Sequence, residues 1–114
     1  MRLALLAASA WIAAAGFAAA DTIESLYGNT LQVTYPGGNV ERFHVDAGGG
    51  FTLVLATGQS VSAQWERQGD QFCVVAEGAP PGCSDFPMDK SVGDSWEQTR
   101  ADGAVVRYEI VEGR

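Results

Sequence analysis

Hydrophobic and polar residues alternate through most of the chain beyond residue 29, in short segments separated by glycine-containing turns. The alternation is clearest in residues 60–67, where Val61, Ala63 and Trp65 predict a buried face and the residues between them a solvent face. Six further segments show the same period of two: 30–35, 40–45, 51–56, 71–76, 96–100 and 104–111. The pattern therefore predicts about seven β-strands.

The turns recur at Gly37-Gly38, Gly48-Gly49-Gly50, Gly58 and Gly69, at intervals of 10 or 11 residues. Strands at this spacing predict an all-β antiparallel meander of about seven or eight strands that closes into a barrel or sandwich. We favour the barrel, because an open sheet would expose its edges to aggregation. A barrel of this size is filled by side chains or holds one small ligand. The predicted core positions are Leu31, Val33, Tyr35, Phe43, Val45, Phe51, Leu53, Leu55, Val106, Tyr108 and Ile110.

Two segments depart from the strand pattern. Residues 21–27 predict one or two helical turns that cover an open end of the barrel. Residues 77–94 predict one long irregular stretch, which holds three of the four prolines. Loops carried on a rigid scaffold often contain binding residues, so this stretch is a candidate binding segment.

The first twenty residues have the pattern of a signal peptide: Arg2, an apolar run, and Ala18-Ala19-Ala20 as the cleavage site. We expect cleavage before Asp21, a single domain over residues 21–114, and a periplasmic or secreted protein. The alternative is an uncleaved membrane anchor, but residues 3–20 are short for a span and mostly alanine.

The formal net charge of −7 at pH 7 argues against nucleic acid and anionic lipid as partners. We expect a soluble monomer with no stable membrane insertion after cleavage.

The two cysteines, Cys73 and Cys83, predict a disulfide across a loop that contains Pro80 and Pro81. The alternatives are a redox pair, which favours Cys-x-x-Cys spacing, and a zinc site, which needs about four ligands.

Candidate catalytic and metal-binding residues are few. Gly93-Asp94-Ser95 occurs in some serine hydrolases, and His44 is the single histidine, but the chain has no G-x-S-x-G motif. We therefore interpret residues 93–95 as a turn before a strand, and His44 as a surface residue. Oxygen-rich loops can bind Ca²⁺, but Asp85, Asp89 and Asp94 do not form a known calcium motif and predict solvated carboxylates. No cofactor, metal or catalytic activity is expected.

Several short motifs carry a resemblance: residues 27–31 (YGNTL), the segment from Gly58 to Trp65, the pair Cys73 and Cys83, residues 92–96 (VGDSW) and the closing Gly113-Arg114. With these motifs the chain resembles a group of small exported bacterial proteins of unassigned function. The resemblance implies a β-rich periplasmic fold and no catalytic residues. The layout is also loosely similar to periplasmic β-barrels that inhibit proteases or lysozyme.

These observations predict a binding module rather than an enzyme. One class of partner is a small apolar molecule held in the barrel, since such sites are mostly apolar. The other is a protein, in particular a hydrolase that the chain inhibits. The candidate binding residues are Tyr35, Pro80, Pro81, Phe86 and Trp96.

Overall fold

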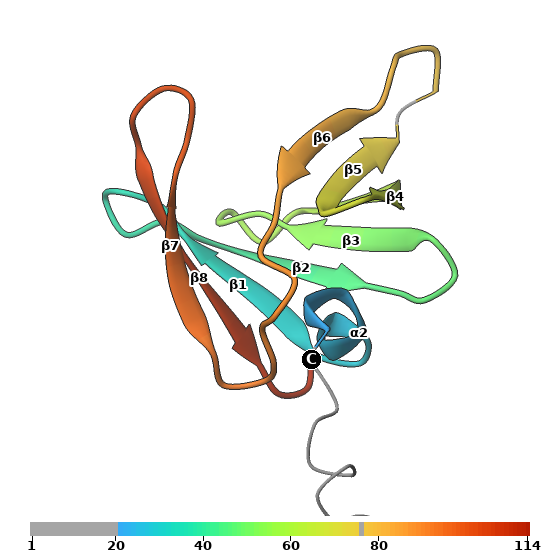
Figure 1. The fold of residues 1–114 in the computed structure, drawn as a ribbon. Coiled ribbons are helices and arrows are strands. Elements are labelled where there is room, and N and C mark those ends of the chain that lie inside the picture. The colour runs from blue at the N-terminus through green and yellow to red at the C-terminus, as the bar shows by residue number, and fades with distance from the viewer. Residues whose placement is uncertain (1–20, 76) are drawn as a thin grey trace, which may run out of the picture.

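The computed structural model describes residues 21–75 and 77–114, which form one sheet and one short helix (Figure 1). Residues 1–20, on which the signal-peptide prediction falls, lie outside the described residues. The elements are α2 (Thr22–Leu26), β1 (Thr30–Thr34), β2 (Val40–Val45), β3 (Gly50–Val54), β4 (Ser60–Gln68), β5 (Gln71–Val75), β6 (Gly82–Asp85), β7 (Ser95–Thr99) and β8 (Val105–Val111). Within residues 21–75 and 77–114, no helix is both long enough and apolar enough to span a bilayer.

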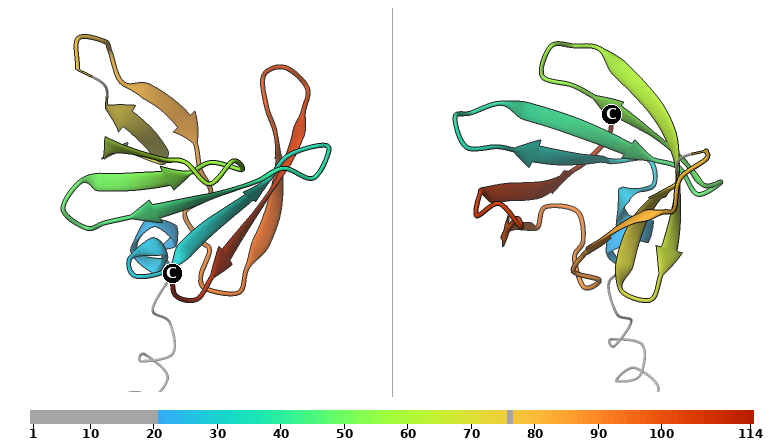
Figure 2. Two further views of the ribbon diagram at one scale, coloured as in Figure 1. Left: turned by 180° about the vertical axis from the view of Figure 1, so that it is seen from behind. Right: turned by 90° about the horizontal axis from the view of Figure 1, so that it is seen from above.

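The eight strands form a single antiparallel sheet in the order β6-β5-β4-β3-β2-β1-β8-β7. After β6 the chain crosses to the opposite edge, where β7 pairs with β8, and β8 pairs with β1. The sheet curls into a half-barrel whose edges are β6 and β7 (Figure 2). The predicted all-β antiparallel meander is therefore confirmed, and its closure is partial.

The strand register brings most of the predicted apolar faces together on the inner side of the curl, but Val61 of β4, predicted to be buried, is 48% exposed. In β1, Leu31 lies opposite both Phe43 of β2 and Ile110 of β8, and Val33 lies opposite Tyr108. The buried cluster is centred on α2, β1, β2, β3 and β8 and consists of Leu26, Leu31, Val33, Val45, Phe51, Val106 and Ile110. The core thus fills the middle of the sheet and leaves the space beside β6 and β7 less filled.

Helix α2 is a single short element that tertiary contacts hold in place. Its N-cap, Asp21, accepts a hydrogen bond from the backbone N–H of Ile23 (3.0 Å). A helix of this length is unstable alone, so the burial of Ile23 and Leu26 is needed. The buried Thr22 hydroxyl accepts a hydrogen bond from the backbone N–H of Lys90 (2.8 Å). The helix therefore anchors the connection between β6 and β7.

The C-terminal arginine fastens the end of the chain to the start of β1. Its guanidinium donates to the carbonyls of Asn29 (2.9 Å) and Val45 (2.7 Å), and it forms an ion pair with Asp46 (2.9 Å). The Asn29 side-chain oxygen accepts a hydrogen bond from Gly113 (2.9 Å). Arg114 thus ties the last strand to the α2–β1 junction and to the end of β2.

The stretch predicted to be irregular, residues 77–94, contains a strand. β6 pairs with β5, and Cys73 lies directly opposite Cys83. The disulfide prediction is confirmed, but the bridge joins paired strands instead of closing an irregular loop. The strand has no apolar alternation and all four of its residues are exposed, so its sequence carried no signal for it.

We predict that replacing both cysteines by alanine lowers the free energy of unfolding by about 3 kcal/mol, because the bridge restricts the unfolded chain. Urea denaturation followed by tryptophan fluorescence measures this change. As a control, a reducing agent should lower the stability of the wild type to the same level and leave the double variant unchanged. A wild type indifferent to reduction would contradict the prediction.

Candidate functional site

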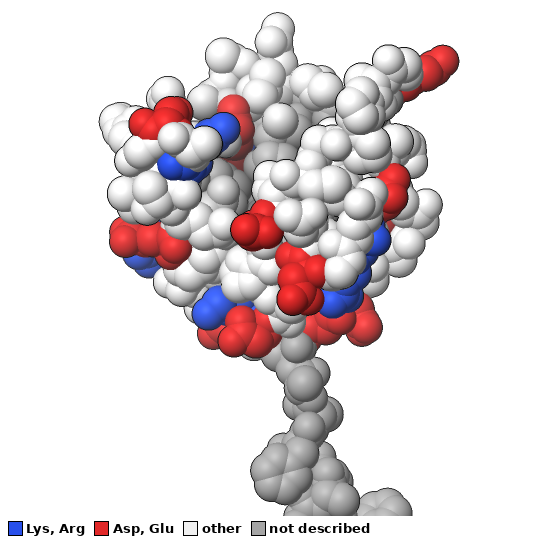
Figure 3. Space-filling view, turned by 45° about the horizontal axis from the view of Figure 1, so that its top comes forward, with Lys and Arg blue, Asp and Glu red and all other residues white. Residues whose placement is uncertain are grey.

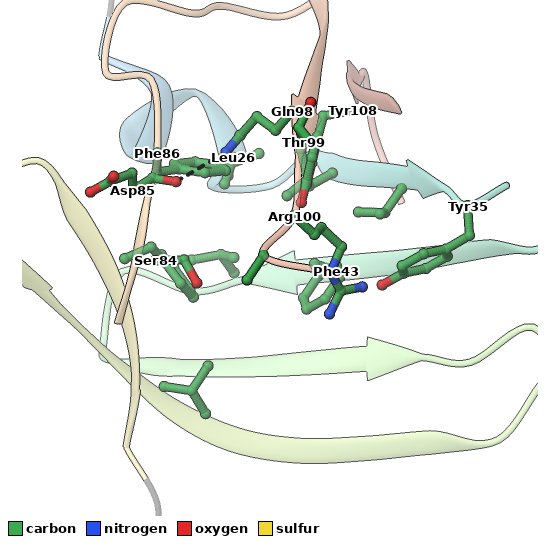
Figure 4. Close-up of a pocket in the computed structure, with 16 residues that line it drawn as sticks. Leu26, Tyr35, Phe43, Ser84, Asp85, Phe86, Gln98, Thr99, Arg100 and Tyr108 are labelled. Carbon is green, nitrogen blue, oxygen red and sulfur yellow. Dashed lines mark hydrogen bonds between the residues drawn. The ribbon is translucent and has the colours of Figure 1, made fainter. Parts of the chain in front are cut away.

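A cavity of about 760 Å³ lies on the inner side of the half-barrel, between the two edges of the sheet (Figure 4). Its volume is in the range typical of small-molecule sites. The floor is apolar and includes Leu26, Leu31, Val33, Phe43 and Val45. The rim is polar and comes from the ends of β6 and β7, with Ser84, Asp85, Gln98, Thr99 and Arg100. The cavity therefore combines a hydrophobic interior with a few hydrogen-bonding groups at its mouth.

The cavity is open because the strand ladder does not continue from β6 to β7. The side-chain amide of Gln98 donates a hydrogen bond to the carbonyl of Asp85 (3.2 Å), which links the two edges at one point. A space-filling view shows a hollow walled mostly by uncharged residues, with a basic and an acidic side chain at its rim (Figure 3). A small molecule can therefore reach the half-buried rings of the cavity lining, such as Phe43 and Phe86, from solvent.

Five aromatic side chains form a row across the gap: Trp65, Phe72, Phe86, Trp96 and Tyr108. Phe86 lies in the middle, with ring centroids 6.0 Å from Phe72 of β5 and 5.8 Å from Trp96 of β7. The two ends of the row are stacked pairs with centroids 5.5 Å apart, Trp65 on Phe72 and Trp96 on Tyr108. Such contacts stabilise beyond the area that they bury. Phe86 therefore joins the two edges by packing.

Tyr35, Glu41 and Arg100 stand together at the mouth. The Tyr35 hydroxyl donates to a carboxylate oxygen of Glu41 (2.9 Å), and the Arg100 guanidinium lies 5.6 Å from the centre of the Tyr35 ring. Burial, reinforced by the hydrogen bond to Glu41, raises the pKa of Tyr35 to about 12. Burial also raises the pKa of Tyr108, against the opposing effect of Arg100. Both phenols are therefore neutral at physiological pH.

The structure places the sequence-predicted binding residues in three different surroundings. Tyr35 and Phe86 line the cavity. Trp96 packs beside it, half-buried, and its indole N–H donates to Gln98 (2.9 Å). Pro80 and Pro81 are exposed at the tip of the β5–β6 hairpin and do not line the cavity.

Sequence reasoning missed Arg100 and Gln98. Trp96 and Gln98 alternate with the outward residues of β7, so a period of two would have placed Gln98 on the inner side, whereas Arg100 lies past the end of β7 and is exposed.

The candidate hydrolase pair does not come together. His44 is on β2 and Ser95 is on β7, and strands β1 and β8 lie between them. At about 4.8 Å per strand this separation is roughly 14 Å, far beyond hydrogen-bond reach. The Ser95 hydroxyl accepts instead from Arg107 (3.3 Å). His44 is half-buried rather than fully solvated, and burial together with Arg114 lowers its pKa.

The acidic residues of the β6–β7 connection have local roles. The Asp94 carboxylate accepts from the backbone N–H of Ser91 (2.9 Å), which forms a turn before β7. The Asp85 carboxylate accepts from Gln71 (3.0 Å). Over residues 21–75 and 77–114, no group of three or more His, Cys, Asp or Glu residues is arranged to hold a metal ion.

The chain was compared with protein-family models, with curated proteins and with solved structures, and no significant match was found in any of them. The geometry of the cavity is therefore the basis on which a function is proposed for this protein.

We predict that Tyr35→Phe makes stability less sensitive to alkaline pH. The folded-state pKa of Tyr35 is raised from 10.0 to about 12, so its contribution is present below pH 10 and is lost as the pH rises through 12. Urea denaturation at a series of pH values from 9 to 12 should show a steeper fall for the wild type than for the variant. Identical slopes would contradict the assignment.

Proposed function

We propose that the protein is a non-catalytic binding module that holds a small apolar molecule in its half-barrel. The observation that carries the proposal is the 760 Å³ cavity, whose exposed apolar lining consists of half-buried aromatic rings such as Phe43, Phe86 and Tyr108. The disulfide between Cys73 and Cys83 supports a periplasmic or secreted location, since such bonds persist in oxidising compartments.

The cavity supplies the driving force for an apolar ligand. Each 100 Å² of apolar surface removed from water contributes roughly 2.5 kcal/mol before the costs of association. The apolar surface that a ligand can cover belongs to half-buried rings such as Phe86 and Tyr108, which are already packed on each other, so little side-chain entropy is lost when a ligand lies on them. A preformed apolar floor of this kind favours binding over chemistry.

The ionisable groups around the cavity also fit a binding role. Glu41 accepts a hydrogen bond from the hydroxyl of Tyr35, and Asp85 accepts one from the side-chain amide of Gln71. A general base or nucleophile needs a partner within hydrogen-bond reach, and His44 and Ser95 lie on separated strands. These contacts support a non-catalytic module.

We predict that Val74→Trp, which places an indole in the cavity, weakens binding of the neutral fluorophore N-phenyl-1-naphthylamine about tenfold or more. Val74 lines the cavity and is 38% exposed. Val105→Trp is the matched control, because Val105 is 49% exposed and lies outside the cavity lining. Fluorescence titration measures both affinities. Failure of the wild type to bind the fluorophore, or equal losses in the two variants, would refute the proposal.

A second function, inhibition of a hydrolase, is supported by the hairpin between β5 and β6. This hairpin projects from the body of the protein (Figure 1). Its tip contains the exposed residues Pro80 and Pro81, and the disulfide clamps the strands behind it. A restrained, projecting segment can enter the cleft of another protein with a low entropy cost.

This second function predicts that the wild type slows a trypsin-type protease or a lysozyme in a steady-state assay. Pro80→Gly/Pro81→Gly should then weaken inhibition about tenfold or more, because the tip becomes flexible. Val74→Trp is the control and should inhibit as the wild type does. An uninhibited rate for both enzymes at high protein concentration would contradict inhibition of these two classes.

A further inference from the structure

Arg100 is the cationic group at the mouth of the cavity. It follows β7 directly, and its backbone is fixed by hydrogen bonds with Ala104 (2.8 Å) and Gly103 (2.9 Å) in the β7–β8 turn. Its side chain lines the cavity and extends toward Tyr35 (Figure 4). The turn therefore holds a positive charge at a defined place on the rim.

The guanidinium of Arg100 is not neutralised by a carboxylate of the protein. Within residues 21–75 and 77–114, the ion pairs are Arg67–Asp21, Lys90–Asp89 and Arg114–Asp46, and the Arg100 guanidinium donates no hydrogen bond to another described residue. The guanidinium lies over the face of the Tyr35 ring, 5.6 Å from the ring centre. All of its donors are therefore free to bind a ligand.

Two carboxylates near the mouth accept hydrogen bonds from uncharged donors. Glu41 accepts the hydroxyl of Tyr35 (2.9 Å), and Asp85, at the opposite edge, accepts the amide of Gln71 (3.0 Å). Both carboxylates keep their negative charge, so an anion at the rim would be repelled by Asp85 on the β6 side and attracted to Arg100 at the end of β7. Gln98 and Thr99 on the same side add neutral hydrogen-bonding groups.

We infer that the ligand is an amphipathic acid, whose apolar chain lies on the cavity floor and whose carboxylate is bound by Arg100. This inference rests on the proposed apolar-ligand function. A single cation at the rim matches a single negative charge, and the planar guanidinium matches the two oxygens of a carboxylate. Lys90, the other cation near the gap, lies over Trp96 (5.9 Å) and does not line this cavity.

The test compares decanoate with 1-decanol, which share the same apolar chain and differ in the headgroup. Each displaces N-phenyl-1-naphthylamine from the folded protein at pH 7.5, and the fluorescence loss gives its affinity. We expect decanoate to bind about three- to tenfold more tightly than 1-decanol, as expected for one charge-assisted contact at a partly exposed site.

Arg100→Gln should abolish this preference by weakening the binding of decanoate about three- to tenfold more than that of 1-decanol. Arg42→Gln is the matched control: it makes the same change in net charge, and Arg42 is exposed on β2 and outside the cavity lining. Arg100→Lys should retain part of the preference for decanoate, because lysine keeps the positive charge but lacks the planar guanidinium that can donate two hydrogen bonds to one carboxylate. Thermal unfolding checks that each variant is folded.

The outcomes separate this inference from the function on which it rests. If 1-decanol binds and decanoate binds no better, the cavity holds apolar molecules and the assignment of an acid is overturned. If Arg42→Gln reduces the preference as much as Arg100→Gln, the effect is one of overall charge and the assignment is also overturned. If neither probe displaces the fluorophore, the proposed function itself fails.

Discussion

The open half-barrel depends on the packing of Phe86 between the two edges of the sheet. A ladder from β6 to β7 would close the barrel and bring the opposite walls together, and side chains would then fill a small barrel completely. Here Phe86 contacts Phe72 on one side and Trp96 and Tyr108 on the other, so aromatic contacts replace the missing ladder. Phe86, together with the hydrogen bond from Gln98 to Asp85, thus holds the two edges near each other and leaves a cavity between them.

Strands β1, β2, β3 and β8 could be predicted from the sequence because each has a face with buried residues. Leu31 and Val33, or Val106 and Ile110, repeat at a period of two, and the turns between the predicted strands contain glycines such as Gly58, whose φ of 93° few other residues adopt. β6 could not be predicted in this way. Its residues bury no apolar face, and its position depends on pairing with β5 and on the disulfide, both of which are contacts between separate segments.

The site was predictable only where its residues have an apolar signal. Tyr35 directly follows β1 and continues the inward alternation of Leu31 and Val33, so its place at the cavity followed from alternation. Arg100 has no such signal, because an arginine at the end of a strand usually points to solvent. Its role depends on the turn that fixes it and on Tyr35, which comes from a strand 65 residues earlier in the chain. The partial closure is likewise a property of the whole sheet, and no local pattern encodes it.

The proposed binding of an acid is compatible with an acidic protein, because the net charge of the protein and the local charge of Arg100 act over different distances. The formal net charge of −7 is spread over the surface, and at physiological ionic strength charges beyond about 8 Å are largely screened. A carboxylate in contact with Arg100 is within this distance, so the two charges of the pair attract each other although Arg100 is exposed. In the proposed complex the local arginine therefore decides the sign of the preferred headgroup, although the overall charge of the protein is negative.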